Sequence, residues 1–300
     1  MLVTSLPEGR LDIIGDVHGE IEALTKLLSV LGYSTAGVHP SGRRLVFVGD
    51  LTDRGPDSPA VIDFVSQLVA DERGYCVLGN HDLNLLLELE KHDNGWFYGD
   101  AFEHDGKLIP QRLADDDVRT RTLDFFRTLP VALERPGLRV VHAYWDQDAI
   151  SRVRGEPDVK ALFKQYESQI AVECAMDASI DETDQGLRHQ NDNPVKLLTS
   201  GPERRVDTPF EASGKLRYEG RVKWWETHDD SQNLTVFGHY SLGQEVRRSG
   251  SAVCCDYGVS KRYKERLKPS FDGTYELRLA AIRVPEQVVV FDNGTQETLK

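Results

Sequence analysis

The side chains that could carry chemistry in this sequence fall in five short polar clusters. The clusters are GDVHG at 15–19, GDLTDRG at 49–55, GNHD at 79–82, VHA at 141–143 and FGH at 237–239. Together they supply carboxylates, imidazoles and an amide oxygen, a ligand set that suits a pair of divalent ions such as Mn, Fe, Zn or Co. None contains cysteine, which argues against a structural zinc site. A carboxylate can bridge two ions, and a water shared by them is far more acidic than bulk water.

The elements expected around these clusters would bring them together. Apolar runs at 11–15, 45–49, 75–79 and 138–141 predict strands, and apolar periodicity predicts helices at 20–31, 58–71, 82–91 and 117–129. Asp16 and Asp50 are 34 positions apart and Asp50 and Asn80 are 30 apart, so each interval fits one strand–helix–strand unit. Open α/β sheets bind ligands at the carboxyl edge of the strands, where the clusters are expected to lie.

The second half of the chain has a different pattern. We expect an amphipathic helix at 159–170, a surface loop or mobile insertion at 175–193, and strands at 234–238, 252–256, 276–283 and 287–292. No internal repeat is visible. The chain therefore predicts one α/β domain over residues 1–300, with an insertion or lid at about 150–230.

Composition limits the possible classes of protein. The 300 residues are 39% apolar and 28% charged, and no apolar run approaches the length of a membrane span. The net charge of −13 disfavours non-specific duplex binding but allows an anionic substrate held by arginine or metal. Four cysteines form no C-x-x-C pair and the N-terminus resembles no signal peptide, so we expect a cytoplasmic protein.

Each cluster also has an ordinary explanation. Asp16 could cap the next helix, its neighbouring glycines could serve a tight turn, and His142 alone could be a hydrogen-bonded histidine near the core. These explanations give no reason why six ligand-type residues should end successive strands. Taken jointly, the clusters predict a dinuclear metal site.

The ordered series GDVHG, GDLTDRG, GNHD, His142 and FGH resembles the calcineurin-like metallophosphoesterase superfamily. The DRG sequence resembles the branch that contains Ser/Thr protein phosphatases and bacterial diadenosine tetraphosphatases. The resemblance implies a four-layer α/β sandwich, with two mixed β-sheets face to face and helices outside. It also implies two divalent ions, with Mn expected first and Fe, Zn, Co or Ni as alternatives.

The resemblance further implies which residues hold the ions. Asp16 and His18 would hold the first metal, Asp50 would bridge both, and Asn80, His142 and His239 would complete the second. Many superfamily members carry a second His two residues after the last one, where this chain has Ser241. Members of the DRG branch are similar in lacking it.

Three residues beside the expected ligands have chemical roles. Arg54 offers a planar fork for two phosphate oxygens, although a salt bridge at a helix start is the alternative. His81 could protonate the leaving oxygen. Asp53 could hydrogen-bond His81 and raise its pKa, and the resemblance points to the same pairing.

Other features have two interpretations each. Trp96 and Trp224 could stack on a nucleobase or fill the core. Arg204 and Arg205 could form a second phosphate clamp or a solvated charge run. Tyr257 could reach the site or pack in the core.

The leading hypothesis is a metal-dependent phosphohydrolase acting on phosphoesters or phosphoanhydrides. LTDRGP and LGNHDLNLL look most like bacterial dinucleoside tetraphosphatases, with a phosphorylated small molecule or nucleotide as substrate. A Ser/Thr, dual-specificity or Tyr protein phosphatase, with a phosphoprotein as substrate, is the main alternative. The segment 193–203 is similar to the phosphatase module of bacterial RNA end-repair enzymes, which makes an RNA-end phosphatase a further one. A metal-binding module without turnover is the non-enzymatic alternative.

Overall fold

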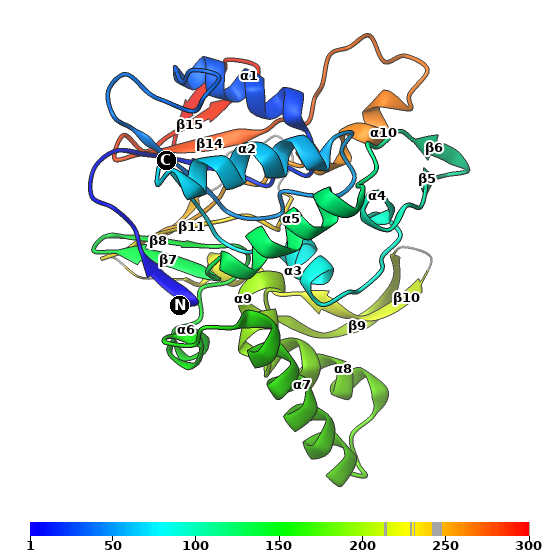
Figure 1. Ribbon diagram of the computed structural model, residues 1–300. Coiled ribbons are helices and arrows are strands. Elements are labelled where there is room, and N and C mark those ends of the chain that lie inside the picture. Colours follow the sequence, from blue (N-terminus) through cyan, green and yellow to red (C-terminus); the bar gives the residue numbers. More distant parts are fainter. Residues whose placement is uncertain (213–214, 229, 231, 242–247, 300) are drawn as a thin grey trace.

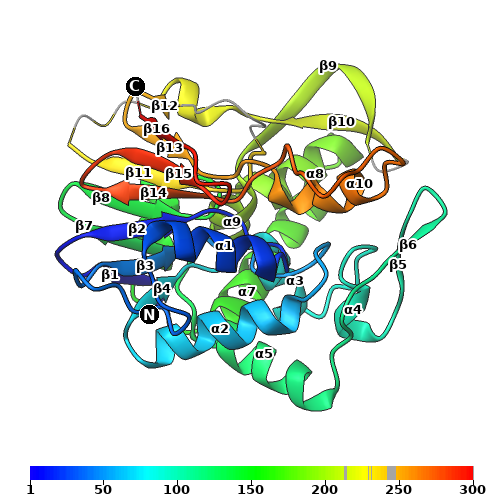
Figure 2. The same ribbon diagram turned by 90° about the horizontal axis from the view of Figure 1, so that it is seen from above.

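Two six-stranded mixed β-sheets pack face to face in this computed structural model, and helices cover their outer faces (Figures 1 and 2). The structure describes residues 1–300 except 213–214, 229, 231, 242–247 and 300. The predicted fold class is confirmed. Among the described residues, no helix has the length and apolar character needed to cross a bilayer.

Each sheet contains three neighbouring strands that run parallel to one another. One sheet has the order β1 (Val3–Ser5), β7 (Ala132–Arg135), β8 (Leu138–Val141), β11 (Leu234–Phe237), β13 (Ala252–Cys254), β12 (Arg248–Ser249). The other has the order β16 (Gln296–Thr298), β15 (Val288–Phe291), β14 (Ala280–Val284), β2 (Leu11–Ile14), β3 (Arg44–Phe47), β4 (Gly74–Cys76). Because β8, β11 and β13 are mutually parallel, as are β2, β3 and β4, their carboxyl ends meet at one edge of each sheet.

The remaining elements connect and cover the sheets. The α-helices are α1 (Ile21–Leu31), α2 (Ser58–Ala70), α3 (Asn80–Leu86), α4 (Gly95–Tyr98), α5 (Asp116–Thr128), α6 (Gln147–Val153), α7 (Val159–Met176), α8 (Glu182–Asn191), α9 (Pro194–Ser200) and α10 (Arg262–Arg266). Two single 3₁₀ turns are η1 (Trp224–Glu226) and η2 (Val259–Lys261). Two hairpins pair β5 (Phe102–His104) with β6 (Lys107–Ile109), and β9 (Glu203–Ala212) with β10 (Lys215–Arg221).

The side-chain alternation of the strands explains the layers. On β3 and just after it, Leu45 and Phe47 face the helices, whereas Val46 and Val48 face the opposite sheet. All four are fully buried. A strand buried on both faces reads as a continuous apolar run, which is why LVFV was recognisable as a strand.

The segment predicted as a loop at 175–193 is instead largely helical. Helix α7 continues to Met176, and α8 begins after Asp181, whose side chain accepts from the backbone N–H of Asp184. Arg188 and Asp192, one helical turn apart, form an ion pair that also stabilises α8. The prediction was wrong because caps and ion pairs, not an apolar stripe, stabilise α8. The expected helix at 82–91 is also shorter, and the strand expected at 276–283 begins at Ala280.

Helices α7 and α8 extend away from the two sheets (Figure 1). Helix α9 returns the chain to them, and the backbone N–H of Ala143 donates to the Leu198 carbonyl. That residues 150–230 are an insertion into one domain stays a prediction.

Candidate active site

The six predicted metal ligands lie together at the carboxyl edge of both sheets. Asp16 and His18 follow β2, Asp50 follows β3, Asn80 follows β4, His142 follows β8 and His239 follows β11. The backbone N–H of His239 donates to both carboxylate oxygens of Asp16, at 3.0 and 3.2 Å. This contact joins the two sheets at the site.

His18 faces two carboxylates. Its Nε2 lies 3.5 Å from Asp50 Oδ2 and 3.9 Å from Asp16 Oδ2. Its Nδ1 lies 2.8 Å from the carbonyl oxygen of Thr52 and can only donate to it. The proton is thereby placed on Nδ1, and the Nε2 lone pair is directed at the carboxylates, as metal-binding histidines require.

Asp50 also faces the second group of candidate ligands. Its Oδ2 lies 3.3 Å from His142 Nε2, which is 3.1 Å from Asn80 Oδ1. His239 Nδ1 lies 2.8 Å from the same Asn80 oxygen. His142 Nδ1 donates to the carbonyl of Val48 at 2.7 Å, so its Nε2 again points into the site. Asp50 is therefore the carboxylate shared by both groups.

Buried negative charge makes this arrangement suit cations. Burial and the nearby carboxylates of Asp256 and Asp50 raise the pKa of Asp16 well above its usual value. Burial disfavours a charged His142, yet Asp50 and Asp16 outweigh it and raise the pKa of His142 to about 10. The charges around His142 therefore favour its positive form, whereas burial lowers the pKa of the other two candidate ligand histidines, His18 and His239. Carboxylate, imidazole and amide donors around such a potential fit divalent cations.

The backbone around these ligands is held in unusual conformations. His18, Asp50 and His239 have φ values of 48°, 49° and 65°, in the left-handed region that non-glycine residues rarely adopt. A Cβ on Gly238 would lie 2.0 Å from Asp16 Oδ1, and one on Gly79 would lie 2.2 Å from Asp50 Oδ1. Only glycine permits these approaches, which explains the Gly-Asp, Gly-Asn and Gly-His pairs of the motifs.

His81 is held by Asp53, as predicted. Its Nδ1 lies 2.6 Å from Asp53 Oδ2, and Trp96 Nε1 donates to Asp53 Oδ1 at 2.7 Å. Burial alone would lower the pKa of His81, but the carboxylates of Asp50 and Asp53 outweigh it and leave that pKa raised. Because both ring nitrogens of His81 are engaged within the chain, it is a poor candidate for a metal ligand.

Arg54 is anchored by a residue that sequence reasoning missed. Its Nε donates to Asp93 Oδ2 at 2.8 Å, and its Nη2 lies 3.1 Å from His81 Nε2. The guanidinium is 27% exposed and so can meet a ligand, whereas Asp93 is 5% exposed. Asp93 lies 39 positions from Arg54 in a segment without periodicity, so no sequence pattern indicated the pair.

Helix α3 begins at the site, and Asp82 in its first turn helps to cap it. Asp82 accepts from the backbone N–H of Gly79 at 3.2 Å and from that of Leu51 at 3.1 Å. Burial and the charge of Asp50 raise the pKa of Asp82 to about 7. Asp82 therefore ties two of the ligand-bearing loops together.

The aromatic residues with two interpretations are all buried. Trp96 and Trp224 are 0% and 5% exposed, which agrees with the core-packing alternative and not with base stacking. Trp96 instead orients Asp53, and Trp224 Nε1 donates to the Ala143 carbonyl at 2.9 Å. Tyr257 is also buried, with its ring against Phe291, which agrees with the packing alternative.

The arginine of the β9–β10 hairpin that reaches the site is Arg221. Its Nη1 lies 3.4 Å from the carbonyl oxygen of His239. Arg205 instead pairs with Asp181 and Asp184 near the start of α8, and Arg204 is exposed. In the register of the hairpin, Arg221 on β10 lies opposite Glu203 on β9. Sequence reasoning missed it because no strands were expected at 203–221.

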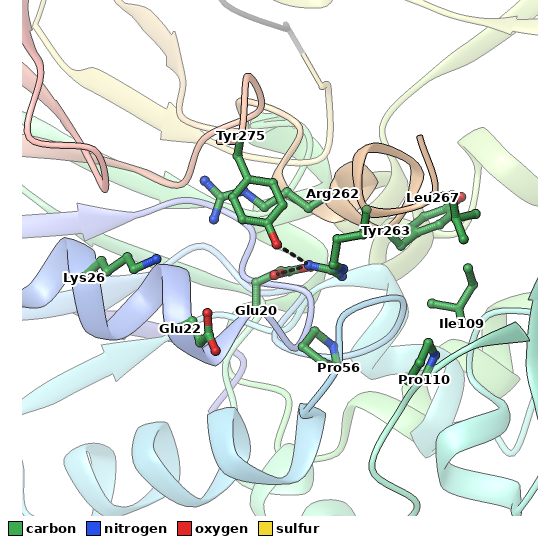
Figure 3. A pocket seen from close by; sticks show the side chains of 11 residues that line it. Glu20, Glu22, Lys26, Pro56, Ile109, Pro110, Arg262, Tyr263, Leu267 and Tyr275 are labelled. Atoms are coloured by element: carbon green, nitrogen blue, oxygen red, sulfur yellow. Dashed lines mark hydrogen bonds and ion pairs between the residues drawn. The ribbon is translucent and has the colours of Figure 1, made fainter. Parts of the chain in front are cut away.

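A cavity of about 420 Å³ lies beside the motif loops, between α1, α10 and the segment after β6 (Figure 3). Arg266 forms a bidentate pair with Glu20 at 2.7 and 3.0 Å, and its Nη1 is 3.3 Å from the Tyr275 hydroxyl. The guanidinium of Arg262 lies over the Tyr275 ring. These polar groups satisfy one another, and no candidate metal ligand lines the cavity.

Comparison with curated proteins gives short but close matches. Asymmetrical bis(5'-nucleosyl)-tetraphosphatases named PrpE are 52% identical over 75 residues in Oceanobacillus iheyensis and 51% identical over 75 residues in Geobacillus sp. WCH70. Each match covers 24% of this chain and 30% or 31% of the relative. The chain thus matches less than a third of the length of these relatives.

Solved structures and a family model cover far more of the chain. A candidate diadenosine tetraphosphatase aligns over 96% of both chains, with a TM-score of 0.53 and 20% identity. A cold-active protein tyrosine phosphatase from Shewanella aligns over 100% of this chain and 82% of its own, with a TM-score of 0.53 and 16% identity. At these identities both show the fold alone. The model of the calcineurin-like phosphoesterases matches residues 9–271, and this chain belongs to that family.

Proposed function

We propose that this phosphoesterase hydrolyses nucleotide phosphoanhydrides, with dinucleoside polyphosphates as its preferred substrates. One observation carries the proposal: six ligand-type side chains converge where the carboxyl edges of the two sheets meet, and Arg54 and the His81–Asp53 pair lie beside them. The similarity of a 75-residue segment to bis(5'-nucleosyl)-tetraphosphatases supports the choice of substrate class.

The family uses a dinuclear centre of divalent ions, and among the described residues Asp50 lies in one group of candidate ligands with His18 and His81 and in another with His142 and His239. We propose that Asp16, His18 and Asp50 hold one ion, and that Asp50, Asn80, His142 and His239 hold the other. Mn is the ion that we propose first, because mixed oxygen and imidazole donors accept it well. When bound, such ions supply Lewis acidity to water and to the phosphoryl group.

Arg54 is placed to change partners when substrate arrives. In the arrangement seen, its Nη2 lies 3.1 Å from His81 Nε2, where its positive charge opposes a proton on that nitrogen and lowers the pKa of His81. Its Nε stays on Asp93, which fixes the guanidinium plane. A phosphate that takes the outer N–H groups of Arg54 would remove the donor facing His81.

His81 is then free to assist departure of the leaving group. With Arg54 turned to phosphate, Nε2 can hold a proton and give it to the leaving oxygen. Asp53 stabilises the protonated ring through its carboxylate, and Trp96 keeps that carboxylate oriented. Arg54 and Arg221 would neutralise charge on the phosphoryl oxygens.

The charge of the chain disfavours the protein-phosphatase alternative. A net charge of −13 repels acidic phosphopeptides. A compact polyphosphate can take its binding energy from a few cations at the site, whereas a peptide also needs an extended groove. The four cysteines are buried free thiols, which suits the cytoplasmic location that we propose.

A substrate panel tests this proposal. Purified Mn-loaded protein would be assayed with diadenosine tetraphosphate, phosphopeptides, RNA with terminal phosphates and 4-nitrophenyl phosphate, at matched ionic strength. We expect the highest kcat/KM for diadenosine tetraphosphate. A phosphopeptide that wins by tenfold, about 1.4 kcal/mol of transition-state stabilisation, would establish the protein-phosphatase alternative instead.

A further inference from the structure

A third cation stands at the edge of the site besides Arg54 and Arg221. Lys261 ends the 3₁₀ turn η2 and is exposed to solvent. Burial of part of its side chain lowers its pKa, Asp256 raises it, and Arg54, Lys264 and Arg221 lower it further. Its ammonium group therefore lies within electrostatic reach of both arginines of the site.

The backbone after β13 directs Lys261 to this position. The strand leads to Asp256, whose Oδ1 accepts from the backbone N–H of Gly258 at 2.8 Å. Gly258 has a φ of 79°, and a Cβ there would lie 2.8 Å from Ser241 Oγ. The turn η2 follows at once and brings Lys261 Nζ within 3.1 Å of the same Ser241 oxygen.

Ser241 marks the edge of the candidate metal centre. It lies two residues after His239, at the position where many superfamily members have another histidine. In the described part of the chain, no carboxylate lies within ion-pair distance of Lys261. The ammonium group of Lys261 thus contacts a hydroxyl, and Asp256 is the carboxylate whose charge acts on it from a distance.

We propose that Lys261 and Ser241, with Arg221 nearby, form a subsite for the phosphates of a polyphosphate chain that lie beyond the attacked phosphorus. This inference rests on the proposed function and deepens it. A monoester has a single phosphate, which would bind at Arg54 and the candidate metal centre. A polyphosphate carries further negative charges that need partners, and an ammonium group with a rotatable stem suits phosphates that differ in position.

The first test compares two substrates in one variant. Lys261→Met is expected to lower kcat/KM at least tenfold more for diadenosine tetraphosphate than for 4-nitrophenyl phosphate, since a charged hydrogen bond is lost only with the longer substrate. Lys261→Arg should restore much of the difference. The control is Lys264→Met, which removes a nearby lysine whose Nζ lies over the Tyr263 ring instead.

The second test measures binding without turnover. Calorimetry of metal-free protein with inorganic triphosphate should show at least fivefold weaker binding in Lys261→Met, with orthophosphate affected less and Lys264→Met unchanged. Thermal unfolding would verify that each variant is folded. Equal losses for both substrates, together with unchanged triphosphate binding, would overturn the subsite.

The two proposals fail in different ways. If the wild-type protein does not hydrolyse diadenosine tetraphosphate but binds triphosphate through Lys261, the proposed function is wrong and the subsite stands. If it hydrolyses diadenosine tetraphosphate and Lys261→Met is indistinguishable from Lys264→Met, the function stands and the subsite is wrong.

Discussion

The contact between His81 and Asp53 should control how the enzyme treats poor leaving groups, and Asp53→Asn tests this. Asp53 Oδ2 lies 2.6 Å from His81 Nδ1, and the two side chains are 1% and 11% exposed. Asparagine keeps an oxygen that can accept from Trp96 Nε1, but its amide NH2 then faces His81 Nδ1, so the change removes both the charge and the acceptor that favour a protonated His81.

The expected size of the effect follows from this geometry. A hydrogen bond to a charged group contributes about 1.5–3 kcal/mol, against about 0.5–1.5 kcal/mol for a neutral pair. Loss of the charge should therefore cost about 1.4 kcal/mol, or about tenfold in rate, where a protonated His81 is needed. His81→Ala should lose the whole general-acid contribution, about 10²–10⁴-fold.

A series of phosphate esters with leaving groups from alkyl alcohols to 4-nitrophenol measures the effect. We expect both variants to lose most with the alkyl esters and least with 4-nitrophenyl phosphate, because an acidic leaving group departs without a proton. The double variant should be no slower than His81→Ala, since Asp53 acts through His81. Asp57→Asn is the matched control, because Asp57 caps α2 and asparagine caps equally well.

An equal loss along the whole series would refute the reasoning. His81 would then position substrate instead of supplying a proton. Additive losses in the double variant would show that Asp53 has a separate role.

Three further predictions concern metal binding and stability. Asp50→Ala or Asn80→Ala should abolish turnover and lower metal content while the metal-free protein still unfolds cooperatively; near-normal activity with unchanged metal content would remove both from the ligand set. Burial would raise the pKa of Asp93, but the charges of His81 and Arg54 outweigh it and lower that pKa to about 2. The ionised Asp93 should therefore add about 2 kcal/mol to the free energy of unfolding above its unfolded pKa of about 3.9. This contribution should be lost as the pH falls toward 2. Urea unfolding should therefore show Asp93→Asn less stable than wild type at pH 7 and closer to it at pH 3; a constant difference would contradict this. Glu20→Gln should lower the free energy of unfolding by about 2 kcal/mol, less than a fully buried pair because its partner is 28% exposed, and an unchanged melting temperature would contradict this.

The sequence predicted the centre of the site because its residues lie at strand ends. Asp16, Asp50 and Asn80 each follow a short apolar run, and the separations match strand–helix–strand units. Local pattern and topology therefore agree on where these side chains meet. His142 and His239 come from the other sheet, and both their strand-end positions and the resemblance joined them to the first three.

The residues around that centre could not be predicted from local pattern. Asp93 and Lys261 lie outside the long helices and the strands. Each contacts a residue, Arg54 and Ser241 respectively, that is 20 or more positions away in the sequence. Arg221 lies on a hairpin whose polar strands lack the apolar alternation by which strands are found. Trp96 fills the core, as one of its two interpretations held, but no pattern indicated that its indole N–H also orients Asp53.

Anomalous diffraction from crystals of the Mn-loaded protein tests the central claim most directly. We predict two Mn peaks on either side of Asp50, one beside His18 and Asp16 and the other among Asn80, His142 and His239. In Asp50→Ala crystals both peaks should weaken together, because the shared carboxylate is gone. A single peak, or peaks away from these side chains, would contradict the dinuclear site on which the proposed phosphohydrolase activity depends.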